Sequence, residues 1–195
     1  MEQEPEQRDW PRLRDDIRSC WRCSLSETRR HALPGEGPTD ARALLVAQAP
    51  GAFEDAAGRM FVGPTGDLLN QLLNHAGLSM DAFYRTNLVK CHLPKNRRPR
   101  VAEIRACATH LDDELALLRP LAICTMGLCA ARAVLARIEG TLLDRPALRA
   151  LRGRVLTFER VRFVALDHPA AALHDPSRRD RLFHDYLTLR ELLDP

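Results

Sequence analysis

Four cysteines have the spacing of metal ligands. Cys20 and Cys23 form a C-x2-C pair, and Cys91 and Cys107 follow much later in the chain. The last two frame a basic, proline-containing segment, which is an unusual setting for a cysteine that only fills a core. Four thiolates suit either a structural zinc ion or an iron–sulfur cluster. The quartet therefore predicts a metal centre and leaves the choice of metal open.

Two further cysteines are better explained by packing. Cys124 ends the apolar run Leu-Ala-Ile-Cys, which is typical of a buried strand, and Cys129 stands near the start of a stretch with helical character. A free cysteine behaves as a small apolar side chain in such places. The acidic residues 1–6 lack the pattern of a secretory signal. We therefore expect a cytoplasmic protein whose thiols stay reduced.

Length and composition suit one globular domain over residues 1–195, with residues 1–9 as a frayed tail. Hydrophobic residues make up 45% of the chain, and no apolar run approaches the roughly 20 residues of a membrane span. We expect a soluble monomer without membrane association. The net charge of +3 is small, but Lys and Arg concentrate between residues 90 and 105. That concentration suits a polyanionic partner, and solvated basic faces explain it equally well.

Strand-like and helix-like segments alternate along the chain. Apolar runs bounded by turn residues predict the strands, and leucines at helical spacing predict the helices. Alternation of this kind favours an α/β fold, a three-layer α/β/α sandwich around a mostly parallel sheet. The expected strands span 43–47, 83–89 and 121–125, with a hairpin over 154–166, and the expected helices span 10–19, 66–77, 101–118 and 177–193, with another after residue 127.

Polar residues follow three of these strands. Gln48 precedes a Pro-Gly turn, Asn87 stands at the end of the second strand, and His168 follows the hairpin. The carboxyl ends of parallel strands share one edge of a sheet, where open α/β folds bind ligands. Each residue alone is explained as an ordinary loop residue. Together the three predict a binding crevice.

Six motifs occur in a fixed order. They are Cys20-x2-Cys23, Ala47–Gly51 followed by Glu54-Asp55, Phe61–Gly63, Thr86–Cys91, Asn96-Arg97 with Pro99, Glu103 and Cys107, and His168-Pro169. In this combination the chain resembles the iron–sulfur uracil-DNA glycosylases, family 4 of the uracil-DNA glycosylase superfamily, from about Cys20 to Leu192. Several motifs in order are much harder to obtain by chance than any one of them.

The resemblance implies a uracil-DNA glycosylase-like fold and an enzyme of base excision repair. Such an enzyme hydrolyses the N-glycosidic bond of uracil, or of another deaminated base, in DNA, and it does so without forming a covalent link to the DNA. A stacked nucleotide must first be flipped out of the duplex. The resemblance also implies a [4Fe–4S] cluster on the four cysteines with a structural role, and a structural zinc ion is the alternative.

Particular residues inherit roles from this resemblance. Phe61 would stack on the flipped base, and the amide of Asn87 would read the uracil edge, because it both donates and accepts hydrogen bonds. His168 would donate to uracil O2 as negative charge develops on the leaving base. Without the resemblance, Phe61 is explained as a core aromatic and His168 as a loop histidine. Lys95, Arg97 and Arg98 lie between two of the four cysteines, and this position suits contacts to the DNA backbone. Leu173 either fills the gap in the duplex or packs at the start of a helix, and the sequence explains both equally well.

Two positions depart from the family pattern. Relatives carry Gly-Glu where this chain has Ala47-Gln48, and many carry serine in place of Ala170. A glutamine positions water but neither accepts its proton nor stabilises a cationic sugar by charge, so we expect slower catalysis. Glu54 and Asp55 are nearby carboxylates. The alternative function is a catalytically weak or inactive protein that binds DNA or lesions, and a zinc-containing α/β protein without a nucleic-acid role is a third.

Overall fold

The computed structural model describes residues 9–140 and 149–193. Residues 1–8 of the expected tail lie outside the described residues. Asp9, which we had assigned to that tail, instead caps the first helix, α1 (Trp10–Arg18): its carboxylate accepts a hydrogen bond from the N–H of Arg12 at 2.9 Å. Asp is a preferred residue at this position because it satisfies an amide that the helix leaves free.

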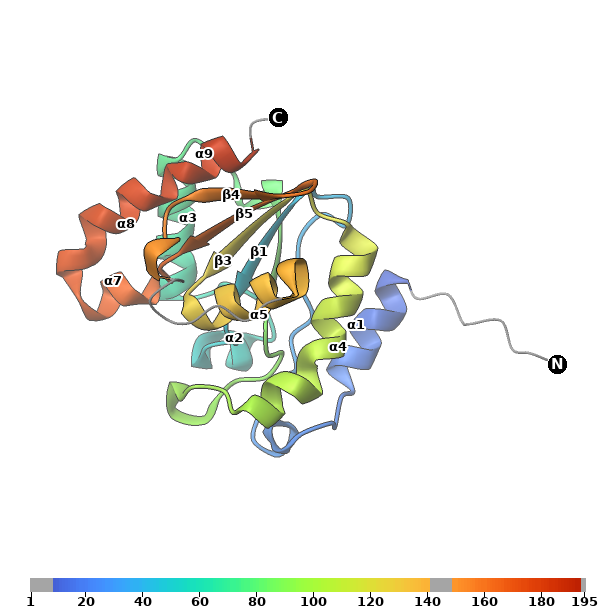
Figure 1. The fold of residues 1–195 in the computed structure, drawn as a ribbon. Helices are drawn as coiled ribbons and strands as arrows, with labels where there is room; N and C mark the ends of the chain where they lie inside the picture. The colour runs from blue at the N-terminus through green and yellow to red at the C-terminus, as the bar shows by residue number, and fades with distance from the viewer. Residues whose placement is uncertain (1–8, 141–148, 194–195) are drawn as a thin grey trace.

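Five strands form one central sheet (Figure 1). They are β1 (Ala43–Ala47), β2 (Phe83–Asn87), β3 (Ala122–Met126), β4 (Val155–Phe158) and β5 (Val161–Leu166). The spatial order is β2-β1-β3-β5-β4, and every neighbouring pair is parallel except β4 with β5. The expected mostly parallel sheet and the terminal hairpin are confirmed.

Helices cover both faces of the sheet, as Figure 1 shows. Besides α1, these helices are α3 (Pro64–His75), α4 (Val101–Leu118), α5 (Leu128–Glu139), α8 (Arg179–Tyr186) and α9 (Thr188–Leu193). One core joins Leu44 and Val46 to α1, α4 and α5, and the other joins Leu45 to α3, α8 and α9. Successive residues of β1 thus enter opposite cores, because side chains alternate across a strand. The three-layer sandwich is confirmed.

The last expected helix is not continuous. We predicted one helix over 177–193, but the structure has a 3-10 turn, Pro176–Arg178, followed by α8 and then α9. The hydroxyl of Thr188 bonds to the carbonyl of Asp185 at 2.6 Å. Such local bonds from threonine compete with the regular helix pattern, and this one lies at the break.

Strand register aligns the chain segments that carry the expected site. Ala47 pairs with Asn87, and Met126 pairs with Leu166, so the carboxyl ends of β2, β1, β3 and β5 lie in one row. Pairing continues past the end of β2, since the N–H of Val89 donates to the carbonyl of Gln48 at 3.0 Å. Two short helices, α2 (Ala52–Ala57) and α7 (Ala170–His174), follow β1 and β5 at this edge.

Within the described part of the chain, we find no helix with both the length and the apolar character needed to span a bilayer.

Candidate active site

A cavity of about 530 Å³ opens at the carboxyl edge of the sheet. It brings together Gln48, Phe61, Asn87 and His168, which the sequence had separated by many residues. Arg97 and Leu173 line it too, whereas Lys95 and Arg98 do not. Side chains that we had not expected there are Phe53, Thr65, Asn96, Met126 and His174.

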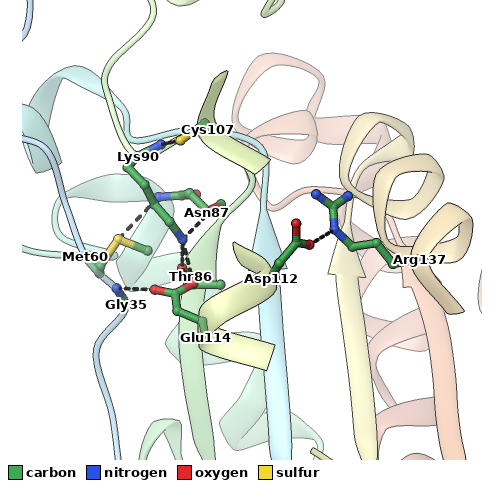
Figure 2. A network of polar contacts seen from close by, with 9 residues as sticks. All are labelled: Gly35, Met60, Thr86, Asn87, Lys90, Cys107, Asp112, Glu114 and Arg137. Carbon is green, nitrogen blue, oxygen red and sulfur yellow. Dashed lines mark hydrogen bonds and ion pairs between the residues drawn. The ribbon is translucent and has the colours of Figure 1, made fainter. Parts of the chain in front are cut away.

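Asn87 lies at the inner end of this cavity. It is the last residue of β2 and is 3% exposed. Its side-chain Nδ2 lies 3.3 Å from the sulfur of Met60, which is a weak acceptor. Its main-chain carbonyl accepts a hydrogen bond from Nζ of Lys90 at 2.9 Å (Figure 2). The backbone of Asn87 is therefore fixed, while its amide keeps hydrogen-bonding capacity for a ligand.

His168 is held as a neutral imidazole. Burial lowers the pKa of His168 from its usual 6.5 to about 4. The N–H of Ala170 donates to Nδ1 at 3.3 Å, so Nδ1 is an acceptor and carries no proton. In a neutral imidazole the proton then resides on Nε2, which becomes a hydrogen-bond donor. The turn into α7 thus sets the tautomer of this histidine.

The backbone of Phe61 adopts an uncommon conformation. Its φ is 52°, in the left-handed region, which is strained for a bulky side chain. The start of α3 packs closely against the main chain of Phe61. A Cβ on Gly66 would lie 1.9 Å from the carbonyl oxygen of Phe61, so only glycine fits at position 66. The ring of Phe61 is half-buried in the wall of the cavity.

Gln48 is half-buried at the cavity, directly after β1. Its side chain makes no hydrogen bond to another described residue, so the amide is available to water or ligand. The turn that follows is held by the segment after Cys91, because Nδ1–H of His92 donates to the carbonyl of Pro50 at 3.0 Å. The main chain of Gln48 is fixed by its bond from Val89.

The two neighbouring carboxylates are occupied by structural contacts. Glu54 lines the cavity and accepts a hydrogen bond from the N–H of Gly51. Burial raises the pKa of Glu54, and the amides of Gly51 and Phe61 partly counter this. Asp55 is buried and accepts from the N–H groups of Arg30 and His31, both within 3.1 Å. Neither carboxylate is a free substitute for an acid at position 48.

The basic loop after Cys91 contributes unequally to the cavity. Arg97 is bound to Glu103 by two hydrogen bonds, of 2.8 and 2.5 Å, so its charge is largely compensated. This pair lowers the pKa of Glu103 and raises that of Arg97. Lys95 and Arg98 are exposed. Lys95 has a φ of 57°, and it makes no ion pair with a described residue.

Two large apolar side chains stand at the mouth of the cavity. Phe53, on α2, is 65% exposed, and Leu173, on α7, is 44% exposed. Phe53 packs against Gly63, where a Cβ would come within 2.9 Å of its ring. Among the described residues, the other large exposed apolar side chains are Trp21 and Val101, and neither lines this cavity. The mouth is therefore unusually apolar for this protein surface.

The four cysteines of the quartet come from three separate segments. Cys20 and Cys23 follow α1, Cys91 pairs with Ala32 in an isolated bridge, and Cys107 lies on α4. Burial raises the pKa of Cys91, the guanidinium of Arg29 partly counters this, and charge on Cys23 and Cys20 adds a smaller rise. Burial raises the pKa of Cys107 to about 11, and charge on Cys91 and Cys20 adds to this. The thiols thus lie within electrostatic range of one another.

Hydrogen-bond donors accompany these sulfurs. The guanidinium of Arg29 donates to Cys91 Sγ at 3.1 Å and to the carbonyl of Cys20 at 2.6 Å, and the N–H of Lys90 lies 3.3 Å from Cys107 Sγ. All six cysteines are free thiols. Among the described residues, no three His, Cys, Asp or Glu side chains are arranged to hold a single metal ion. Free thiols with N–H donors have the chemistry that an iron–sulfur cluster requires.

The other two cysteines fit their expected roles. Cys124 is fully buried in the core of β3, where burial raises the pKa of its thiol. Cys129 is half-buried on α5 and packs against the other core.

Comparison with known proteins identifies the family. The model of the uracil DNA glycosylase superfamily matches residues 34–189, which is most of the chain. The chain belongs to the uracil DNA glycosylase superfamily. The matched range includes all four residues expected at the base cavity and two of the four cysteines of the quartet, Cys91 and Cys107.

Relatives in this superfamily cover nearly the whole chain. A type-4 uracil-DNA glycosylase of Archaeoglobus fulgidus is 36% identical over 183 residues, which is 91% of this chain and 89% of that protein. One of Sulfurisphaera tokodaii is 34% identical over 184 residues, covering 93% and 83%. A type-5 uracil-DNA glycosylase of Pyrobaculum aerophilum is 33% identical over 156 residues, covering 71% and 65%. The similarity thus places the chain in the type-4 branch of the superfamily.

Some residues in and around this cavity were not predicted from the sequence. Phe53 lies in a short helix, and nothing in the sequence indicated that its side chain would be exposed. Arg29 and Glu114 lie far in sequence from the residues they contact, so only the folded chain reveals them. Lys90 lies inside a motif that we had used. A lysine directly after the apolar residues Leu88 and Val89 was the feature that could have indicated a buried charge.

Proposed function

We propose that this protein is a uracil-DNA glycosylase that hydrolyses the N-glycosidic bond of deoxyuridine in DNA. The base would be flipped out of the duplex and the product would be an abasic site. The observation that carries the proposal is the cavity in which Asn87 and His168 meet, in a chain of this superfamily. At about 530 Å³ the cavity is large enough for a pyrimidine with part of its sugar.

Base recognition is assigned to Asn87 and Phe61. The amide of Asn87 would accept from N3–H of uracil and donate to O4, a pattern that cytosine does not match at its fourth position. Its burial supports this role, because in a site without water a mismatched hydrogen bond costs more than on the surface. The ring of Phe61 would stack on the face of the base.

Departure of the base is assigned to His168. As the glycosidic bond breaks, negative charge develops on the uracil ring, including O2. His168 is a neutral imidazole with its proton on Nε2, so its Nε2–H would donate a hydrogen bond to that oxygen. A donor aimed at charge that appears only in the transition state lowers the barrier rather than only improving binding.

Water activation is assigned to Gln48. Its free amide would hold a water molecule beside the sugar, and the cationic character of the sugar in the transition state would draw that water in. Glutamine does not take up the proton, so we expect slower turnover than with a carboxylate at this position. Glu54 and Asp55 do not compensate, because both are engaged by main-chain amides.

The four cysteines are assigned to a [4Fe–4S] cluster. When bound, the cluster would supply a rigid cross-link between Cys20, Cys23, Cys91 and Cys107. The chain's own contribution is the set of N–H donors around the sulfurs, which stabilise thiolate ligands. Contacts to DNA phosphates are assigned to Lys95 and Arg98, which are exposed, with a smaller part for Arg97, whose charge Glu103 compensates.

The decisive test is uracil release from single- and double-stranded oligonucleotides by the wild type and by Gln48→Glu. We expect release by both proteins, and faster release by Gln48→Glu, because the carboxylate adds a general base, worth on the order of 10²-fold or more. Inactivity of both proteins with tight binding of uracil-containing DNA would instead favour a lesion-binding protein.

The metal is tested on protein purified without oxygen. We expect a brown sample that contains iron and sulfide, with Cys107→Ala losing the colour and part of its thermal stability. A colourless wild type with one zinc per chain would overturn the iron–sulfur assignment and leave the glycosylase proposal standing.

A further inference from the structure

Beneath the cavity lies a pair of buried charges that none of the roles above uses. The side chains of Lys90 and Glu114 are 1% and 0% exposed, and Nζ of Lys90 lies 2.6 Å from Oε2 of Glu114. A buried ion pair loses so much hydration that apolar side chains of similar volume often stabilise a core as well or better. Stability alone therefore does not explain this pair.

The ammonium group of Lys90 makes three hydrogen bonds at the end of β2 (Figure 2). Its acceptors are Thr86 Oγ1 at 2.6 Å, Glu114 Oε2 at 2.6 Å and the main-chain carbonyl of Asn87 at 2.9 Å. An ammonium has three donors, so all are used. The hydroxyl of Thr86 also donates to Glu114 at 2.7 Å. Lys90, Thr86 and Glu114 thus form a closed network, and the carbonyl of Asn87 is attached to it through the ammonium group of Lys90.

Both partners of the pair are anchored away from the cavity. The N–H of Lys90 contacts Cys107 Sγ, and its carbonyl accepts from Leu33 at 2.7 Å. Glu114 lies on α4, and its second oxygen accepts from the N–H of Gly35 at 2.9 Å. Because these anchors come from different segments, the network ties the end of β2 to α4 and to the cysteine cluster.

We propose that Lys90, together with Glu114, is a positioning residue that holds Asn87 for uracil. The inference rests on the proposed function, because it concerns how Asn87 meets the base. The side-chain amide of Asn87 has one weak contact, to Met60. Its direction is therefore governed by its main chain, which Lys90 holds. Small displacements matter, because paired hydrogen bonds to a base tolerate little misalignment.

The test removes both charges at once, so that neither is left buried alone. The variant is Lys90→Met with Glu114→Gln. The control is Asp112→Asn with Arg137→Met, which removes a partly exposed ion pair of 2.5 Å between α4 and α5 that does not line the cavity (Figure 2). Three quantities are measured: the dissociation constant of free uracil, the single-turnover rate of uracil release, and the affinity for uracil-free duplex.

In the Lys90/Glu114 variant we expect uracil to bind about tenfold more weakly, because the amide of Asn87 is displaced but not removed, and we expect release to slow to a similar degree. Affinity for uracil-free duplex and the iron content should stay within about twofold of the wild type. The control variant should change none of these. A folded Lys90/Glu114 variant with unchanged uracil binding and release would overturn the proposal.

A milder variant guards against a failure to fold. Thr86→Val keeps both charges and removes the hydroxyl between them, and we expect about threefold weaker uracil binding with the fold intact. Unchanged uracil binding in Thr86→Val, alongside an unfolded Lys90/Glu114 variant, would mean that the network serves stability alone. If the wild type neither binds nor releases uracil, the proposed function fails first, and that outcome is visible before any variant is made.

Discussion

The floor and the rim of the cavity are built on different principles. The floor consists of Gln48, Asn87 and His168, which stand at or just after strand ends and are fixed by main-chain hydrogen bonds. The rim consists of Phe53, Leu173 and Asn96 of the basic loop, which line the cavity and are exposed. The sheet register sets the floor, whereas short helices and a loop set the rim. The floor is thus suited to select the base and to do the chemistry, and the rim to bind the duplex.

The largest effect is expected at the floor, from His168→Ala. Removing a donor to the charge that develops on the leaving base should lower the rate of uracil release by about 10²- to 10³-fold. Affinity for DNA with an abasic site should stay within about twofold, since the rim is intact. Single-turnover kinetics and a DNA-binding titration measure the two quantities. Equal losses in rate and affinity would show that the floor and rim are not separable.

The next effect is expected from Asn87→Ala, also at the floor. Two hydrogen bonds between neutral groups are lost, which amounts to about 30-fold weaker binding of free uracil. The rate should fall with it, whereas uracil-free duplex should bind as before. Isothermal titration with uracil is the direct measurement, and Asn96→Ala, at the exposed end of the same cavity, is the matched control. Strong uracil binding by Asn87→Ala would remove this residue from base recognition.

The contrast between floor and rim also explains what the sequence predicted. Gln48, Asn87 and His168 were predictable, because each stands at or just after the end of a strand and parallel strands share an edge. Phe53 was not, since exposure of a side chain on a short helix depends on how that helix packs. Nor was the compensation of Arg97 by Glu103, although both residues lay in a recognised motif. Local pattern determines strand ends well and determines the packing of surface segments poorly.

A smaller effect is expected at the rim, from Leu173→Ala and Phe53→Ala. Each removes an apolar contact with the duplex around the flipped nucleotide, and we expect about tenfold weaker DNA binding for Leu173→Ala and about fivefold for Phe53→Ala. Binding of free uracil should not change, because neither variant alters the floor. Trp21→Ala, an exposed aromatic residue outside the cavity, is the control. Weaker uracil binding in either rim variant would contradict the division.

The smallest expected effect concerns protonation at the floor. Because burial lowers the pKa of His168 to about 4, its imidazole should show no titration between pH 8 and 5.5. An NMR titration of labelled histidine measures this and also reports the tautomer, which we expect to have the proton on Nε2.

The lowered pKa of His168 also makes the stability of the fold depend on pH. The unfolded chain takes up this proton near pH 6.5, so the contribution of His168 to stability is full above that pH and is lost as the pH falls towards 4. His168→Gln should flatten this part of the stability profile without affecting the rim. A His168 that titrates near 6.5 would mean that water solvates the imidazole freely, and the floor would then not differ from the rim in its exposure to water.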